Sequence, residues 1–124
     1  MKLNQDCVRN LLLTIEEELS INEPLDAVRL QQKPRLQQYS LDDIVYTISK
    51  LKEAGFINAD VLVTLDGTDA IVSSLTYNGH LFLDNIRDDG VWKLTKQAAS
   101  KLSSVSLNIL AELASSYIKN KLNL

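Results

Sequence analysis

The chain has 124 residues, of which 45% are hydrophobic and 23% charged, and its formal net charge is -3. This length fits one domain with a modest core, and the composition is typical of a folded globular protein rather than a disordered one. No apolar run is long enough for a signal peptide or a membrane span, and the single cysteine excludes an internal disulfide. We therefore expect a cytoplasmic protein that does not enter a membrane.

The first predicted element is an amphipathic helix that begins near Asn4 or Asp6 and ends near Ser20. Its buried face is expected to consist of apolar residues at helical spacing, namely Val8, Leu11, Leu12, Ile15 and Leu19. The acidic run at residues 16–18 is expected on the solvated face. Residues 21–39 contain two prolines and four glutamines, which predicts a loop with a short strand at residues 28–30.

A second helix is predicted to begin at Ser40, which together with Asp43 forms a capping box, and to end at Gly55. Its apolar stripe is expected to be Leu41, Ile44, Val45, Ile48 and Leu51. Residues 56–65 and 70–75 are rich in β-branched and apolar side chains, and the Asp66-Gly67 pair between them predicts a hairpin turn.

Three further helices complete the predicted chain. Thr76 is expected to cap the first of them, which buries Phe82, Leu83 and Ile86. After a break at residues 88–90, the next helix is expected to use Trp92 for packing and to bury Val91, Leu94 or Thr95, Ala98 and Leu102. The last is expected to start at Ser103 or Ser104 and to end near Leu122.

This order of elements predicts an α+β fold. Residues 1–89 are expected to form a winged-helix-like domain with the hairpin as its wing, and residues 90–124 a C-terminal helical extension that packs on it. The last helix has a wide apolar face, which predicts a homodimer interface at Ile109, Leu110, Leu113 and Tyr117. A coiled coil or a membrane-surface helix fits this segment less well, because no heptad is sustained and few lysines flank it.

The sequence offers little for catalysis. His80, Asp84 and Asp88 can share a helix face, but a zinc site usually needs three or four nitrogen or sulfur ligands. The chain has neither a nucleophile elbow nor a glycine-rich phosphate loop. We therefore expect no catalytic residue, no metal and no cofactor, and a protein that is not an enzyme.

The winged-helix prediction raises DNA binding, for which the candidate contacts are Tyr46, Thr47, Lys50 and Lys52. The same helix begins with Asp42 and Asp43, however, and the wing contains three aspartates and no basic residue. These carboxylates would repel phosphates, from whose neutralisation most DNA affinity comes. An unidentified protein partner is therefore the leading expectation, and a DNA-binding transcriptional regulator is the alternative.

Three segments of the chain carry a family resemblance: MKLNQDCVRNLLLTIEE, YSLDDIVYTISKLKEAGFI and LTYNGHLFLDNIRDDGVWKLTK. Together they resemble the bacterial and phage proteins of domain-of-unknown-function family 2513. The resemblance implies a bacterial or prophage accessory protein with a winged-helix-like fold, and it implies no reaction, substrate or cofactor. It also suggests a site in the last segment, formed by Gly79, His80, Phe82, Leu83, Ile86, Arg87 and Trp92. Packing explains His80, Asp84 and Arg87 least well, so these three are the candidate interaction surface.

Overall fold

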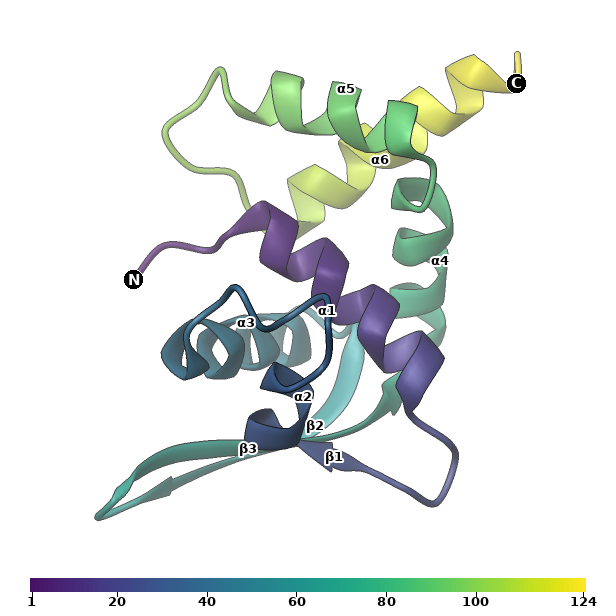
Figure 1. The fold of residues 1–124 in the computed structure, drawn as a ribbon. Helices are drawn as coiled ribbons and strands as arrows, with labels where there is room; N and C mark the ends of the chain where they lie inside the picture. The colour runs from purple at the N-terminus through teal and green to yellow at the C-terminus, as the bar shows by residue number, and fades with distance from the viewer.

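The computed structural model describes residues 1–124 and has an α+β fold of six helices and one three-stranded antiparallel sheet (Figure 1). This confirms the α+β part of the predicted fold class. The elements are α1 (Gln5–Glu18), β1 (Leu25–Asp26), α2 (Ala27–Gln31), α3 (Leu41–Glu53), β2 (Ile57–Thr64), β3 (Gly67–Leu75), α4 (Tyr77–Ile86), α5 (Asp89–Ala99) and α6 (Leu107–Lys121).

Every helix begins at a side chain that accepts a hydrogen bond from the backbone N–H three residues later. The capping residues are Asn4, Asp26, Ser40, Thr76, Asp88 and Ser106. Each cap satisfies one of the amide groups that a helix leaves free at its start. The caps predicted at Asn4, Ser40 and Thr76 are confirmed, whereas the last helix starts later than predicted, because Ser106 rather than Ser103 or Ser104 caps it.

The sheet has the strand order β1-β3-β2, and both pairings are antiparallel. The strand predicted at residues 28–30 is wrong, because these residues lie in α2. The Asp26 side chain accepts the N–H of Arg29 and starts this helix immediately after β1. The hairpin loop is also shifted by one residue: Thr64 pairs with Gly67, so the loop is formed by residues 65 and 66.

One hydrophobic core joins all parts of the chain. In Figure 1, α1 lies at the centre, with the sheet and α3 on one side and α5 and α6 on the other. The core cluster includes five residues from the C-terminal part of the chain, namely Trp92, Ala99, Leu107, Leu110 and Ala114. Residues 90–124 therefore contribute to the same core as residues 1–89, and no separate core is formed.

The buried face of α5 agrees with the prediction at Val91 and at Thr95, one of two alternatives, and differs from it at Leu102, which lies beyond the helix. Val91, Trp92, Thr95 and Ala99 point into the protein, while Leu94 and Leu102 are exposed. Trp92 is only 4% exposed and belongs to the core cluster. The expectation that Trp92 is a packing residue is therefore confirmed.

The hairpin of β2 and β3 extends outward from the body of the protein, past α3 (Figure 1). β1 pairs with Ile71 and Val72 of β3, so the outer half of the hairpin has no third strand beside it. None of the helices combines the length and the apolar character needed to cross a bilayer.

Candidate functional site

The third segment of the family resemblance contains Thr76, which follows β3 and caps α4. The Thr76 hydroxyl donates to the carbonyl oxygen of Gly55 (2.6 Å) and accepts the N–H of Gly79 (3.0 Å). The Thr76 N–H donates to the carbonyl oxygen of Phe56 (3.1 Å). Thr76 therefore fixes α4 against the turn that follows α3.

Gly79 allows α4 to approach this turn closely. A Cβ atom at residue 79 would overlap the carbonyl group of Phe56, so no other residue fits without a backbone shift. One turn later, the ring of Phe82 packs on that of Phe56, with 5.0 Å between the centroids. Both residues of this pair are buried. Gly79 and Phe82 thus have structural roles in the core.

The three candidate surface residues on α4 face the end of α1. Arg87 forms a bidentate ion pair with Glu16, in which Nη1 and Nη2 each lie 2.7 Å from a carboxylate oxygen. It also forms a longer contact with Asp84, at 3.2 Å. The hydrogen bonds from Arg87 hold the pKa of Glu16 below its usual range. His80 is exposed and lines a small pocket of about 140 Å³ beside Glu16. The structure brings the three residues to one side of α4, but the charge of Arg87 is already paired.

The acidic run on α1 is on the surface, as expected, and each of its carboxylates also has a cationic partner. Glu17 pairs with Arg35, and Glu18 pairs with Lys33 at 3.3 Å. With Glu16 bound to Arg87, the run connects α1 to α4 and to the segment after α2. Carboxylates near a helix C-terminus are unfavourable by themselves, and the three cations offset that cost.

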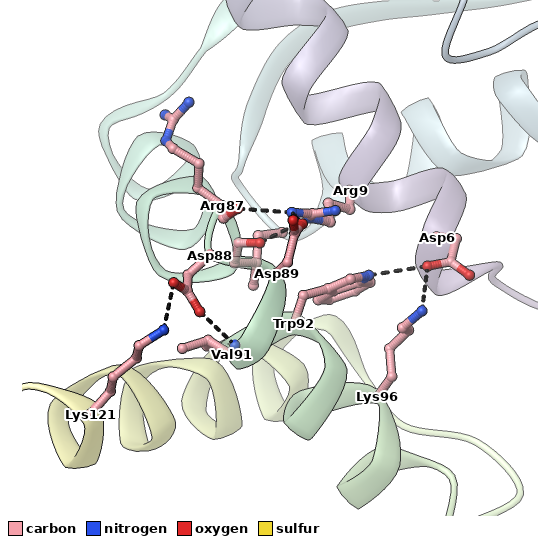
Figure 2. A network of polar contacts seen from close by, with 10 residues as sticks. Asp6, Arg9, Arg87, Asp88, Asp89, Val91, Trp92, Lys96 and Lys121 are labelled. Carbon is pink, nitrogen blue, oxygen red and sulfur yellow. Dashed lines mark hydrogen bonds and ion pairs between the residues drawn. The ribbon is translucent and has the colours of Figure 1, made fainter.

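Arg9 on α1 holds the C-terminal end of α4. Its guanidinium donates to the carbonyl oxygens of Ile86 (2.9 Å) and Arg87 (2.8 Å) and to the Asp89 carboxylate (2.7 Å). Figure 2 shows Arg9 beside Arg87 and Asp89. The last carbonyls of a helix lack partners within the helix, so a cationic donor from another helix is an effective cap. Arg9 thus connects α1 with the break between α4 and α5.

The same network ties the C-terminal helices to α1 and α4. The indole nitrogen of Trp92 and the ammonium of Lys96 both donate to Asp6, at 3.1 and 3.0 Å (Figure 2). Asp88 accepts the N–H of Val91 (2.8 Å) and pairs with Lys121 of α6 (2.7 Å). Within residues 76–92, the side chains of Arg87, Asp88, Asp89 and Trp92 therefore join α4 and α5 to α1 and α6.

The structure has few side chains arranged to bind a metal ion or to act as a nucleophile. No group of three or more His, Cys, Asp or Glu side chains is placed to hold a metal ion. Cys7 is a free, buried cysteine, and burial raises the pKa of its thiol. A thiol in such a position is a poor nucleophile.

The candidate DNA contacts on α3 are not all accessible. Thr47 is only 1% exposed, and its hydroxyl donates to the carbonyl oxygen of Asp43 (2.7 Å), so its prediction as a contact is wrong. The helix rotation turns Thr47 inward beside Ile48, onto the stripe predicted from apolar residues alone. Tyr46 and Lys50 are half-buried, and the Lys50 ammonium lies 3.0 Å from Glu53 and 5.4 Å from the Tyr46 ring. Lys52 is exposed.

The outer half of the hairpin is apolar, acidic and exposed. Leu65 at the tip is fully exposed, and Val63 and Leu62 are 80% and 49% exposed. The acidic side chains at Asp60, Asp66 and Asp69 are exposed as well. The strands contain no lysine or arginine. No packing role within the chain explains these apolar side chains.

Between α3 and the hairpin lies a groove of about 290 Å³, lined among others by Asp42, Val45, Tyr46, Val61 and Thr68. A neighbouring cleft of about 340 Å³ shares Tyr46 and reaches the start of α6. We call the exposed side of α3, this groove and the hairpin at residues 60–69 the α3–hairpin face. The carboxylates of this face could be predicted from the sequence, whereas the groove could not, because it depends on how far the hairpin stands from α3.

The structure leaves three of the four residues of the predicted dimer interface on α6 at least partly exposed and buries the fourth. Leu110 is 1% exposed and belongs to the core, so its assignment to an interface is wrong. Ile109 is 45% exposed, and Leu113 and Tyr117 are half-buried. These three residues follow one another at a spacing of four and form one ridge on the surface of the helix.

Two comparisons with known proteins place the chain in a family. A family model described as "Hypothetical protein (DUF2513)" matches residues 2–106, which end just before α6. The chain is also 29% identical over 123 residues to an uncharacterised protein of Haemophilus influenzae, and the match covers 98% of this chain and 99% of that protein. No solved structure matches the chain. The resemblance seen in the sequence is thereby confirmed: the protein belongs to the DUF2513 family.

Proposed function

We propose that this protein is a non-enzymatic, winged-helix-like accessory protein of bacterial or prophage origin that binds another protein in the cytoplasm. The order α1, β1, α2, α3, β2, β3 supports the winged-helix assignment, with β1 beside β3 and the hairpin of β2 and β3 as the wing. In that assignment α3 takes the place of the recognition helix. The helix before it, α2, has only five residues, which is short for a helix-turn-helix unit.

The observation that carries the proposal is the character of the hairpin. Its exposed Leu62, Val63 and Leu65 contribute nothing to the core, and exposed apolar side chains gathered in one place are typical of an interaction surface. Its three carboxylates have no cationic partner in the chain. A protein partner can satisfy both features, with apolar contacts at the centre and basic residues around them.

DNA binding is the alternative that the element order favours, and charge weighs against it. Of the four candidate contacts, Thr47 is buried and Lys50 is paired with Glu53, which leaves Tyr46 and Lys52. Phosphates near the hairpin would meet Asp60, Asp66 and Asp69 without a compensating cation. We therefore place protein binding first.

A salt series with duplex DNA tests this choice. The protein is titrated into a labelled random duplex at ionic strengths from about 50 to about 200 mM, the range over which phosphate contacts weaken strongly. We expect no binding at any salt concentration. Micromolar binding that falls with salt would contradict the proposal and favour a DNA-binding regulator. In that case Lys52→Glu should abolish binding, and the control Lys101→Glu, outside α3 and the hairpin, should not.

A further inference from the structure

The sheet has one long open edge, which is formed by β2. The strand order β1-β3-β2 places β2 at the end of the sheet, and its eight residues pair with β3 only. No backbone group of residues 58–64 bonds to a loop or a helix either. The backbone N–H and C=O groups on the outer side of β2 are therefore free to pair with another strand.

The open edge lacks most of the features that prevent edge pairing. Natural edge strands are usually short or carry lysine, proline or a bulge. β2 is eight residues long and contains neither lysine nor proline, and its single irregularity lies between Asn58 and Ala59, near the body. From Ala59 to Thr64 the register with β3 is regular. This stretch can accept a partner strand along its whole length.

The charges of the hairpin identify the kind of strand that fits. Asp60 lies on the open strand itself, Asp66 lies in the loop, and Asp69 lies opposite Leu62 on β3. Asp42 lines the groove beside Val61. An added strand with basic residues on the face of Asp60 and Asp69 would compensate these carboxylates, and its apolar residues on the other face would cover Val61 and Val63. A second copy of the chain fits less well, because pairing two such edges would bring two acidic hairpins together.

We propose that β2 accepts an extended segment of the partner protein as a fourth strand, and that this segment alternates apolar and basic side chains. The inference rests on the proposed function and specifies how the α3–hairpin face binds. Strand addition gains affinity from main-chain hydrogen bonds, and side chains at alternate positions supply the specificity.

The register indicates which backbone groups the added strand would use. Thr64 and Gly67 close the two-residue loop, and hydrogen-bonded and non-hydrogen-bonded pairs alternate from there along the ladder. This alternation turns the backbone groups of Val61 and Val63 toward the open edge. The cross-strand partner of Val63 is Thr68, whose backbone groups face the opposite edge.

The test uses a synthetic peptide, KVTVKVTV with blocked ends, about as long as β2, and a matched acidic peptide, EVTVEVTV. Binding to the full chain is followed by amide chemical shifts and by hydrogen exchange. Val63→Pro removes an N–H on the open edge, Val63→Thr keeps that N–H but changes the side chain, and Thr68→Pro makes the proline change on the opposite edge. Circular dichroism checks that each variant is folded.

We expect the basic peptide to slow exchange at Val61 and Val63 and the acidic peptide to leave it unchanged. Val63→Pro should weaken binding at least about tenfold, while Val63→Thr and Thr68→Pro should change it by less than about threefold. The exchange result on the unchanged protein stands even if a proline variant does not fold.

Three other outcomes would overturn the inference. If Val63→Pro has no effect but replacing Asp60, Asp66 and Asp69 by asparagine weakens binding, the hairpin binds basic segments without strand addition, and the proposed function is retained. If the basic peptide does not bind, the edge does not take a basic strand. If Val63→Pro instead lowers the mass of the protein in light scattering, the edge pairs with a second copy of the chain.

Discussion

The indole nitrogen of Trp92 lies 3.1 Å from the Asp6 carboxylate, across 86 positions of the sequence. This hydrogen bond joins the first turn of α1 to α5, and Lys96 donates to the same oxygen. Trp92 is 4% exposed and belongs to the same core cluster as Leu11 and Ile44. The C-terminal helices are therefore held to the rest of the protein by both packing and polar contacts.

Replacing Trp92 by phenylalanine should separate these two contributions. Trp92→Phe keeps most of the buried ring and loses the hydrogen bond, so we expect the free energy of unfolding to fall by about 1 kcal/mol. Trp92→Ala also leaves a cavity, and we expect a loss of about 3 to 5 kcal/mol. Urea unfolding measures both. Equal losses in the two variants would show that the hydrogen bond, rather than packing, dominates this contact.

Gly79→Ala should be far more damaging than its size suggests. The added methyl group would overlap the Phe56 carbonyl, so α4 would have to move away from the turn after α3. We expect a loss of at least about 2 kcal/mol, the range of overpacked cores. Gly90→Ala is the matched control, because its methyl group would meet only side-chain atoms of Asp88 and Lys121, and it should change stability by less than about 1 kcal/mol. Similar effects in the two variants would contradict the close approach at Gly79.

Acid should destabilise the protein through the ion pairs of the helices. Hydrogen bonds from Arg87 lower the pKa of Glu16, and Lys121 does the same for Asp88. Burial alone would raise the pKa of Asp6, but Lys96 and Trp92 outweigh it, so this pKa is lowered as well. A carboxyl group whose pKa is lower in the folded state stabilises the protein above its unfolded-state pKa. That stabilisation is lost as the pH falls through the folded-state value.

The unfolding midpoint in urea should therefore decrease as the pH falls below about 4, the ordinary range of carboxyl groups. Glu16→Gln should lower stability at neutral pH and make the acid dependence shallower, because the carboxylate that binds Arg87 no longer titrates. Glu112→Gln, at an exposed residue without an ion pair, should leave the pH profile unchanged. A profile that Glu16→Gln leaves unchanged would exclude this pair as a source of acid sensitivity.

The ridge on α6 leads to a prediction about assembly. We propose that Ile109, Leu113 and Tyr117 form a homodimer interface, since all three retain exposed apolar surface after folding. Ile109→Asp should then halve the mass in light scattering while the helical circular dichroism signal is kept. Leu110→Asp should instead unfold the protein, because it places a charge in the core. A folded Ile109→Asp variant of unchanged mass would exclude this interface.

The local parts of the fold could be predicted from the sequence because their causes are local. Ser40 and Thr76 were identified as helix caps, since a cap depends on residues only three positions away. Gly55 has a φ of 82°, as expected for a glycine that ends a helix. The hairpin was located from its β-branched residues, although its loop is shifted by one residue.

The remaining features depend on contacts between distant residues. α2 is an exception: it forms where a strand was expected although its cap, Asp26, is local, and only Leu25 and Asp26 pair with β3. The pairing of Glu16 with Arg87 spans 71 positions, so nothing near either residue indicated it. Within the candidate surface on α4, Arg87 is paired with Glu16 and Asp84, whereas His80 is exposed and forms no ion pair. The role of this surface stays a prediction.

We expect the hairpin tip, rather than the polar surface of α4, to contact a protein partner. A photoreactive amino acid placed at Leu65 tests this claim in cells, and the same residue at Ile21 is the control, because both side chains lie in loops and are almost fully exposed. We predict a specific covalent product with one protein from position 65 and none from position 21. No product at position 65, or the same products at both positions, would contradict the claim.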